Sequence, residues 1–205
     1  PMIPARKPDP FPIPAGRPGR RPAPVLALAA LLGACAVPLV TESELDTESG
    51  RAFEEMRQVQ PISTDGNVRR YVNCVVDAIV AQLPEPYRSE EWTVEIFDEP
   101  EDVQAFAMTG GRIGVYTGIF KAARNQDQLG AVIGHEVAHV TEQHALKRVN
   151  RELTTRGAVM AGTAVLGGGY ATGQILSMGA QLGLSLPYSR GNETDADTVG
   201  LKYMA

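Results

Sequence analysis

Residues 129–140 constrain the fold of this chain most, because they combine the apolar content of a buried helix with the pattern His-Glu-x-x-His. On an α-helix, residues four apart differ by about 40° in azimuth, so His135 and His139 project from one face, one above the other. Glu136 sits about 100° round from His135. Two imidazoles in this arrangement can meet one zinc ion, and the glutamate can reach a water on that ion. The alternative is that two core histidines fall four residues apart for packing reasons alone.

A pair of carboxylates near the end of the sequence can supply the remaining ligand. Glu193 and Asp197 lie four apart on a predicted helix and face one way, whereas Asp195 points elsewhere and is expected to be solvated. One carboxylate can bind a metal, and the other can accept the second N–H of a ligand imidazole, which fixes the tautomer of that imidazole. Such a pair is ordinarily surface charge. After a His-Glu-x-x-His helix, the need of the metal for a third protein ligand favours the functional interpretation.

The third histidine, His144, is a test of the metal interpretation. The apolar spacing predicts one long helix over 125–156, and nine residues beyond His135 on such a helix His144 points to the opposite face. We therefore expect His144 to pack or to form hydrogen bonds rather than to bind the same ion. Glu142 and Ala145 stand where the metzincin pattern needs glycine and histidine, which excludes that class.

Two extended segments precede the histidine helix. Residues 92–97 alternate like a strand, and residues 104–118 form two extended runs about Gly110-Gly111, which predicts a β-hairpin. This hairpin has a structural role in any case. Beside a metal site, its edge can also pair with an extended peptide through backbone hydrogen bonds, which gives affinity with little sequence preference.

The remaining helical patterns are easier to place. Residues 41–60 predict an acidic helix with Glu44, Glu48 and Glu55 on a solvated face, and residues 67–83 predict a helix that holds Cys74 in a buried, inert position. Asn125 is the expected cap of the long helix, with Gln128 as its partner in a capping box. Residues 157–184 are interrupted by glycines, and they predict either a mobile cover over the cleft or a tightly packed helix pair.

The N-terminal residues resemble a bacterial lipoprotein signal. Residues 1–34 contain arginines followed by about twelve apolar residues, a pattern typical of a secretory signal and too short to span a bilayer. The run ends in Leu-Gly-Ala followed by Cys35, which resembles a lipobox and predicts lipidation of that cysteine. Ala36 at the next position favours the outer membrane over the inner one. The alternative is an N-terminal hydrophobic helix with an incidental cysteine.

Composition and charge set the broad class. The chain has 205 residues, 43% of them hydrophobic, which suits one domain with a proper core. Its formal charge is −5, and residues 35–205 alone carry −9, so nucleic acid is excluded as a partner. We expect a signal peptide over 1–34, a linker with a helix over 35–66, and a catalytic domain over 67–205.

Three motifs together resemble the HtpX-like gluzincin metallopeptidases, and within them the periplasmic lipoprotein branch. The resemblance covers residues 90–205 in order and spacing. Two positions differ from the usual pattern: Gln104 stands where asparagine is common, and Thr109 stands where proline often precedes the glycines. The motifs are Gln104-Ala105-Phe106 with Gly110-Gly111, Gly134 to Val140, and Ser189-Arg190 to Glu193 with Ala196-Asp197.

This resemblance implies an α+β, zincin-like fold that is mostly helical, with a small antiparallel sheet or hairpin packed beside the histidine helix. It implies one zinc ion per chain, bound by His135, His139 and Glu193. It also implies that Glu136 is the catalytic base and that Asp197 supports His135. The implied substrate-pairing edge consists of Gln104, Ala105, Phe106 and Ala107.

The expected activity is hydrolysis of peptide bonds in unfolded or misassembled envelope proteins, as part of protein quality control. The expected location is the periplasm, with the chain tethered to a membrane by lipid on Cys35. No donor for the tetrahedral oxyanion can be assigned, and we expect the catalytic domain to continue beyond Ala205. The alternatives are a metal-bearing periplasmic chaperone or assembly factor without hydrolysis, and a structural lipoprotein without metal. Retention of Glu136 argues against the chaperone, because a binder has no need of that base.

Overall fold

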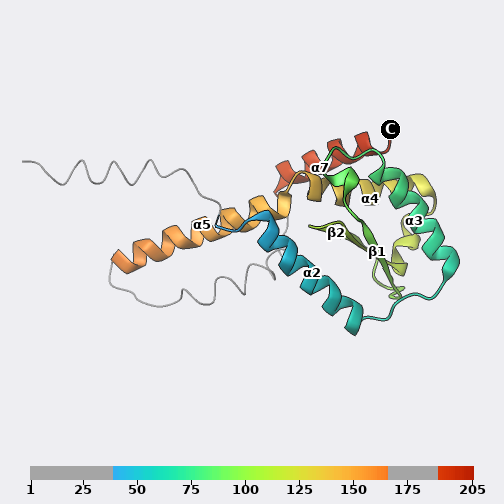
Figure 1. The fold of residues 1–205 in the computed structure, drawn as a ribbon, viewed down its shortest axis with the longest axis horizontal. Coiled ribbons are helices and arrows are strands. Elements are labelled where there is room, and N and C mark those ends of the chain that lie inside the picture. Colours follow the sequence, from blue (N-terminus) through green and yellow to red (C-terminus); the bar gives the residue numbers. More distant parts are fainter. Residues whose placement is uncertain (1–38, 166–188) are drawn as a thin grey trace, which may run out of the picture. The chain divides into compact units, whose positions relative to one another are not determined.

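The computed structural model describes residues 39–165 and 189–205, and the predicted mixture of helices with a small sheet is confirmed (Figure 1). The predictions for residues 1–34, for Cys35 and for residues 166–184 concern parts of the chain outside the described residues. No helix in that part is both long and apolar enough to cross a bilayer. The elements are α2 (Glu42–Val59), α3 (Gly66–Val80), a 3-10 turn (Tyr87–Ser89), β1 (Thr93–Phe97), β2 (Ala105–Met108), β3 (Arg112–Tyr116), a second 3-10 turn (Thr117–Lys121), α4 (Gln126–Thr141), α5 (His144–Val165) and α7 (Arg190–Tyr203).

The sheet has three strands in the order β1-β3-β2. Strands β2 and β3 form the predicted antiparallel hairpin, and Gly110 and Gly111 at its turn have φ values of 81° and 69°, a left-handed conformation that favours glycine. The expectation of a small antiparallel sheet or hairpin is confirmed for β2 and β3, but the sheet as a whole is mixed, because β1 pairs with β3 in parallel. Residues 98–104 cross from β1 to the opposite edge of the sheet, where β2 lies antiparallel to β1. Strand β3 then lies between β1 and β2.

The two faces of the sheet are covered by different helices. On one face the rings of Phe97, Phe106 and Tyr116 cluster, and Phe53 of α2 meets Phe106 edge-on at a centroid distance of 6.3 Å. On the other face β-branched side chains of the strands form the main core with α3 and α4. The fully buried members of this core include Ile96, Ile113, Val115, Val72, Val76, Leu129, Ile133 and Val137. Burial of side chains of this size stabilises the fold by about 1.5–3 kcal/mol each.

Helix α3 begins and ends close to the predicted limits, but the prediction for Cys74 was wrong. Asp65 caps α3 by accepting the backbone N–H groups of Asn67 and Val68. The residues that face the core are Val72, Val75, Val76 and Ile79. Cys74 is exposed, because it lies on the solvent side of this stripe together with Asp77 and Ala78.

The prediction of one long helix over 125–156 was also wrong. Helix α4 ends at Thr141, and α5 begins at His144. Between them Gln143 has a φ of 52°, a left-handed conformation that is typical of helix C-termini. The Asn125 cap is confirmed, since its side chain accepts the N–H of Gln128. The side chain of Gln128 accepts the N–H of Arg124 instead of closing a capping box.

Candidate metal centre

Helix α4 presents His135 and His139 on the face that turns toward α7. Their ring centroids lie 4.8 Å apart, and their Nε2 atoms are separated by 3.1 Å. His135 is partly exposed, whereas His139 retains 4% of its accessible surface. Burial, followed by the neighbouring His135 and His144, lowers the pKa of His139 to about 4. His139 is therefore neutral at physiological pH, which is the form that binds a metal.

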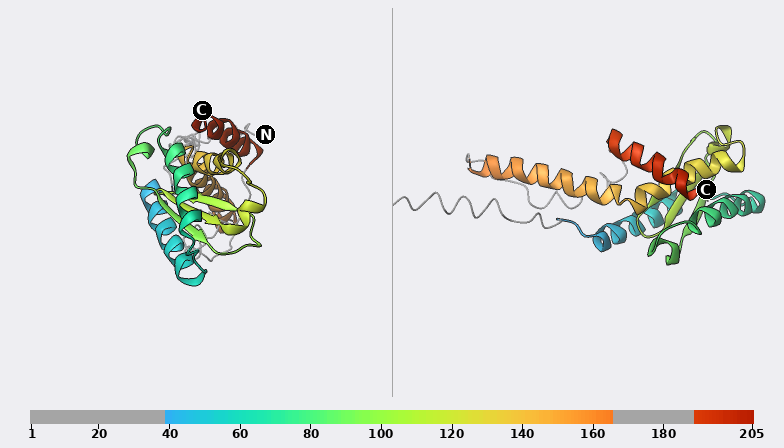
Figure 2. Two further views of the ribbon diagram at one scale, coloured as in Figure 1. Left: turned by 90° about the vertical axis from the view of Figure 1, so that its right-hand side faces the viewer. Right: turned by 90° about the horizontal axis from the view of Figure 1, so that it is seen from above.

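Helix α7 lies along α4 and brings two carboxylates to the imidazoles (Figures 1 and 2). The two helices touch at Gly134 and Gly200, where an added Cβ would come within 2.9 Å of the opposite backbone. Ser189 caps α7 by accepting the N–H of Asn192, which sets the start of the helix one turn before Glu193. The close crossing is what allows side chains of α7 as short as an aspartate to reach α4.

Glu193 and Asp197 take different positions at the centre. The Glu193 carboxylate lies 3.5 Å from Nε2 of His135 and 3.9 Å from Nε2 of His139. Asp197 instead contacts the opposite ring nitrogen of His135, with its Oδ1 accepting the Nδ1–H at 2.8 Å. Asp195, also on α7, is exposed as predicted. The sequence-predicted residues are therefore brought together, with Glu193 facing the Nε2 atoms and Asp197 lying behind His135.

The donor set fits a single divalent cation. Candidate ligand atoms of His135, His139 and Glu193 lie within 4.8 Å of one another. A tetrahedral ion with bonds of about 2.0–2.1 Å separates its ligand atoms by about 3.3 Å, which is close to the 3.1 Å between the two Nε2 atoms. The Glu193 carboxylate approaches with one oxygen 3.5 Å from His135 and the other 3.9 Å from His139. Two imidazole nitrogens and a carboxylate oxygen are donors that zinc accepts readily.

Glu136 lies next to this cluster and is held by the sheet. Burial raises its pKa to about 7, against the favourable charge of His135, and Glu193 raises it further. The backbone N–H of Ala107 donates to its carboxylate and acts in the opposite direction. A carboxyl group with a pKa near neutrality can both accept and return a proton at physiological pH.

The edge of β2 passes directly beside Glu136. The carbonyl of Gln104 accepts the N–H of Tyr116 at 3.1 Å, and hydrogen-bonded positions alternate along an antiparallel pair. The main chain of Phe106 therefore faces β3, whereas the main-chain groups of Ala105 and Ala107 point outward. The side chain of Phe106 lies in the ring cluster under α2 and is turned away from the imidazoles.

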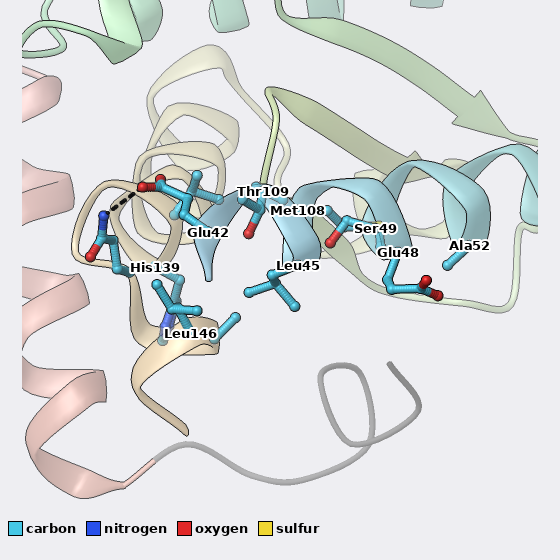
Figure 3. A pocket seen from close by; sticks show the side chains of 13 residues that line it. Glu42, Leu45, Glu48, Ser49, Ala52, Met108, Thr109, His139 and Leu146 are labelled. Carbon is cyan, nitrogen blue, oxygen red and sulfur yellow. Dashed lines mark hydrogen bonds between the residues drawn. The ribbon is translucent and has the colours of Figure 1, made fainter. Parts of the chain in front are cut away.

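A small cavity of about 50 Å³ adjoins the cluster formed by the side chains of His135, His139 and Glu193. It lies between α2, the end of β2 and the corner from α4 to α5 (Figure 3). His139 contributes to its wall. Gln143 donates from Nε2 to Glu42 at 3.1 Å and ties the corner to α2. The apolar residues around the cavity are Leu45, Ala52, Ala107, Met108, Val140, Ala145 and Leu146.

Two features of the site were missed in the sequence. The contact of Gly134 with Gly200 was one, and a glycine immediately before His-Glu-x-x-His is the signal that could have revealed it. The other was His144, whose Nδ1 lies 3.0 Å from Nδ1 of His139. His144 was expected on the opposite face, and this was wrong because the helix breaks at Gln143. The expectation that His144 forms a hydrogen bond is confirmed.

The sequence matches the model of peptidase family M48 over residues 64–205, more than half of the chain. The chain belongs to peptidase family M48. This confirms the metallopeptidase family expected from the motifs, and membership of M48 implies a divalent metal.

Named relatives agree with the M48 assignment. The chain is 31% identical over 115 residues to the mitochondrial metalloendopeptidase OMA1 of Schizosaccharomyces pombe, covering 56% of this chain and 33% of that protein. It is 26% identical over 165 residues to a beta-barrel assembly-enhancing protease of Yersinia pestis, covering 73% and 32%. It is 32% identical over 180 residues to the mitochondrial metalloendopeptidase OMA1 of Bos taurus, covering 80% and 32%. The chain thus spans about a third of the length of the curated relatives it matches.

Proposed function

We propose that this M48 chain is a zinc-dependent endopeptidase that hydrolyses peptide bonds in unfolded or misassembled envelope proteins. The observation that carries the proposal is the convergence of His135, His139 and Glu193 beside the carboxyl group of Glu136. Neither Glu193 nor Asp197 forms an ion pair with a lysine or arginine in the described part of the chain. Two imidazoles and a carboxylate that face one point without a basic partner are the kind of ligand set that binds a cation.

In this proposal His135, His139 and Glu193 hold one zinc ion per chain. The fold around them is zincin-like, with α4 as the metal-binding helix. Bound zinc supplies Lewis-acid chemistry, polarising a peptide carbonyl and acidifying water. Asp197 accepts the Nδ1–H of His135 and so leaves the lone pair of Nε2 directed at the site. This contact sets both the tautomer and the orientation of the ring.

Glu136 is the proposed catalytic base. It accepts a proton from the attacking water and passes it to the leaving amide nitrogen, acting first as a base and then as an acid. The N–H of Ala107 holds its carboxylate at the rim of the β2 edge. In this arrangement the attacking water, the Glu136 carboxylate and the leaving nitrogen all lie beside β2, so each proton transfer covers a short distance.

The substrate is proposed to bind as an extended strand along the segment Gln104, Ala105, Phe106 and Ala107. Because the N–H of Ala107 is taken by Glu136, the groups offered to a peptide are the N–H and C=O of Ala105 and the C=O of Ala107. Backbone pairing of this kind favours unfolded segments and reads little sequence. Phe106 contributes by anchoring the strand to the sheet through its ring contacts.

The cellular setting belongs to the proposal as well. Residues 1–34 are proposed to act as a signal, and Cys35 to carry a lipid that tethers residues 35–66 and the peptidase domain over 67–205 to the periplasmic face of a bacterial outer membrane. The lipobox pattern and the likeness to bacterial proteases support this setting. Replacing Cys35 with serine is expected to release the protein from membranes, which fractionation of cell extracts would detect.

The decisive experiment is Glu136→Gln in the zinc-loaded protein with casein as an unfolded substrate. Loss of a general base lowers the rate by about 10²–10⁴-fold, while zinc content and circular dichroism are expected to stay unchanged. Asp127→Asn, an exposed acid on the same helix, is the matched control and should cleave like the parent.

Two results would contradict the proposal. Cleavage by Glu136→Gln at the parental rate would remove the assigned base. A parent that prevents aggregation of unfolded protein, yet never cleaves it when loaded with zinc, would instead indicate binding without hydrolysis. A chelator control with the parent separates metal-dependent cleavage from a contaminating protease.

A further inference from the structure

His144 is the most buried polar residue near the candidate metal ligands, with 2% of its surface exposed. The left-handed Gln143 ends α4 and lets α5 begin at His144, so the imidazole lies against His139. Its Nδ1 is 3.0 Å from Nδ1 of His139, and the two rings meet edge-on with centroids 5.0 Å apart and planes at 70°. A nitrogen pair at this distance is a hydrogen bond, so one ring carries the proton and the other accepts it.

The direction of this hydrogen bond follows from the other side of His139. Nε2 of His139 points toward Nε2 of His135 and the carboxylate of Glu193, so it must keep its lone pair if it is to bind a cation. A neutral imidazole has one N–H, which then sits on Nδ1. His139 therefore donates to His144, and His144 accepts through Nδ1 and holds its own proton on Nε2.

The two histidines of α4 are supported by acceptors of different kinds. His135 is partly exposed and donates to the exposed carboxylate of Asp197. His139 is almost fully buried, and its acceptor is a neutral imidazole. A carboxylate in the place of His144 would put a negative charge into the interior, which is costly without a partner. A neutral ring supplies an acceptor without that charge.

We propose that His144 is a positioning residue that fixes the tautomer and orientation of His139 for metal binding. The proposal rests on the metal site proposed above, and it adds a residue to which that site does not assign a role. Since partners that orient ligand histidines typically change metal affinity by about 10–100-fold, loss of this acceptor should weaken zinc binding by a factor in that range.

The test compares His144→Leu, which removes the acceptor, with His144→Asn, whose carbonyl can accept the Nδ1–H of His139. Val149→Ala is the matched control, because Val149 is a buried residue of the same helix. Each substitution is made in the Glu136→Gln background, so that hydrolysis plays no part. The readouts are the zinc dissociation constant, from competition with a chromogenic chelator, and the visible spectrum of the cobalt-substituted protein.

The expected result is zinc binding about 10–100-fold weaker for His144→Leu, with an altered cobalt spectrum. His144→Asn should return the affinity to within a few-fold of the parent. Val149→Ala should lower the thermal midpoint and leave zinc affinity unchanged. Parental affinity in His144→Leu would overturn the proposal, and so would equal losses in the leucine and asparagine variants. A parent that binds no zinc would count against the metal site itself, which is a separate failure.

Discussion

Ionisable side chains are buried in two regions of this molecule, and the two regions are built on opposite plans. On the α2 side of the sheet, the carboxylate of Glu95 accepts hydrogen bonds from Arg57 at 2.9 Å and from Arg69 at 3.0 Å, with 6% of its side chain exposed. At the crossing of α4 and α7, imidazoles and carboxylates gather, and neither Glu193 nor Asp197 pairs with a lysine or arginine among the described residues.

The pKa shifts express the same difference. Burial alone would raise the pKa of Glu95, but hydrogen bonds from Arg69 and Arg57 outweigh it and the net pKa is lowered. At Glu136 burial prevails and the pKa rises to about 7. In the first region, the guanidinium groups of Arg57 and Arg69 balance the negative charge of Glu95. The second has lone pairs and negative charge in excess, and a divalent cation from solution would complete it.

Glu193→Gln separates the two regions most strongly. Removing a charged ligand is expected to weaken zinc binding by more than about 100-fold, the upper figure for losing a mere supporting partner, and to reduce cleavage to background. Glu95→Gln removes a carboxylate that is paired with two arginines and should leave zinc affinity unchanged. Equilibrium dialysis of both variants with zinc measures this. Equal zinc affinity in the two variants would erase the proposed distinction.

A second test concerns the stability of the metal-free protein. The pKa of Glu136 is raised in the folded state, so its contribution to stability is present below pH 4.5 and is lost as the pH rises through about 7. Glu136→Gln stays neutral, so its free energy of unfolding should exceed that of the parent above pH 7 by on the order of 2–3 kcal/mol. Urea unfolding at pH 4.5, 6 and 8 in chelator checks this. A gap that does not widen with pH would show that burial does not destabilise this carboxylate.

Asp197→Asn tests the support of His135. The substituted amide accepts the Nδ1–H less strongly than the carboxylate, so zinc affinity should fall by about 10–100-fold. Asp195→Asn, an exposed neighbour on the same helix, should stay within about two-fold of the parent, because among the described residues Asp195 forms no hydrogen bond or ion pair with His135 or His139. Isothermal titration with zinc compares the two. Matching losses would point to the general charge of α7 rather than to the contact with His135.

Much of the local structure could be predicted from the sequence, because it depends on local rules. The hairpin follows from Gly110-Gly111, the position of α3 follows from its apolar spacing, and the start of α4 follows from the Asn125 cap. The parallel pairing of β1 could not be predicted in this way, since strand patterns do not encode the order of strands. The end of α4 was also hidden, because Gln143 adopts a left-handed conformation without a glycine or proline to signal it.

The candidate site shows the same division. The spacing of His135 with His139, and of Glu193 with Asp197, predicts which side chains share a helix face, and the structure brings these four together. The contact of α4 with α7 depends on the close approach of two backbones, and the glycine before His135 is its signal in the sequence. The contribution of the Ala107 backbone leaves no trace in residue type, because every residue except proline offers the same N–H group. His144 was misplaced for the same reason that the helix break was missed.

The smallest expected effect is the loss of stability in Glu95→Gln, and its pH dependence is the informative part. Because Arg57 and Arg69 keep 38% and 40% of their side chains exposed, they remain hydrated when the carboxylate is removed. The free energy of unfolding at pH 7 should therefore fall by only about 1–2 kcal/mol. The lowered pKa of Glu95 means that the stability it contributes is present above pH 4.5 and is lost as the pH falls through its folded pKa. Urea unfolding of parent and variant should thus converge in acid, which is the opposite of the trend at Glu136, and a gap that is constant with pH would show that the arginines do not stabilise the charged form.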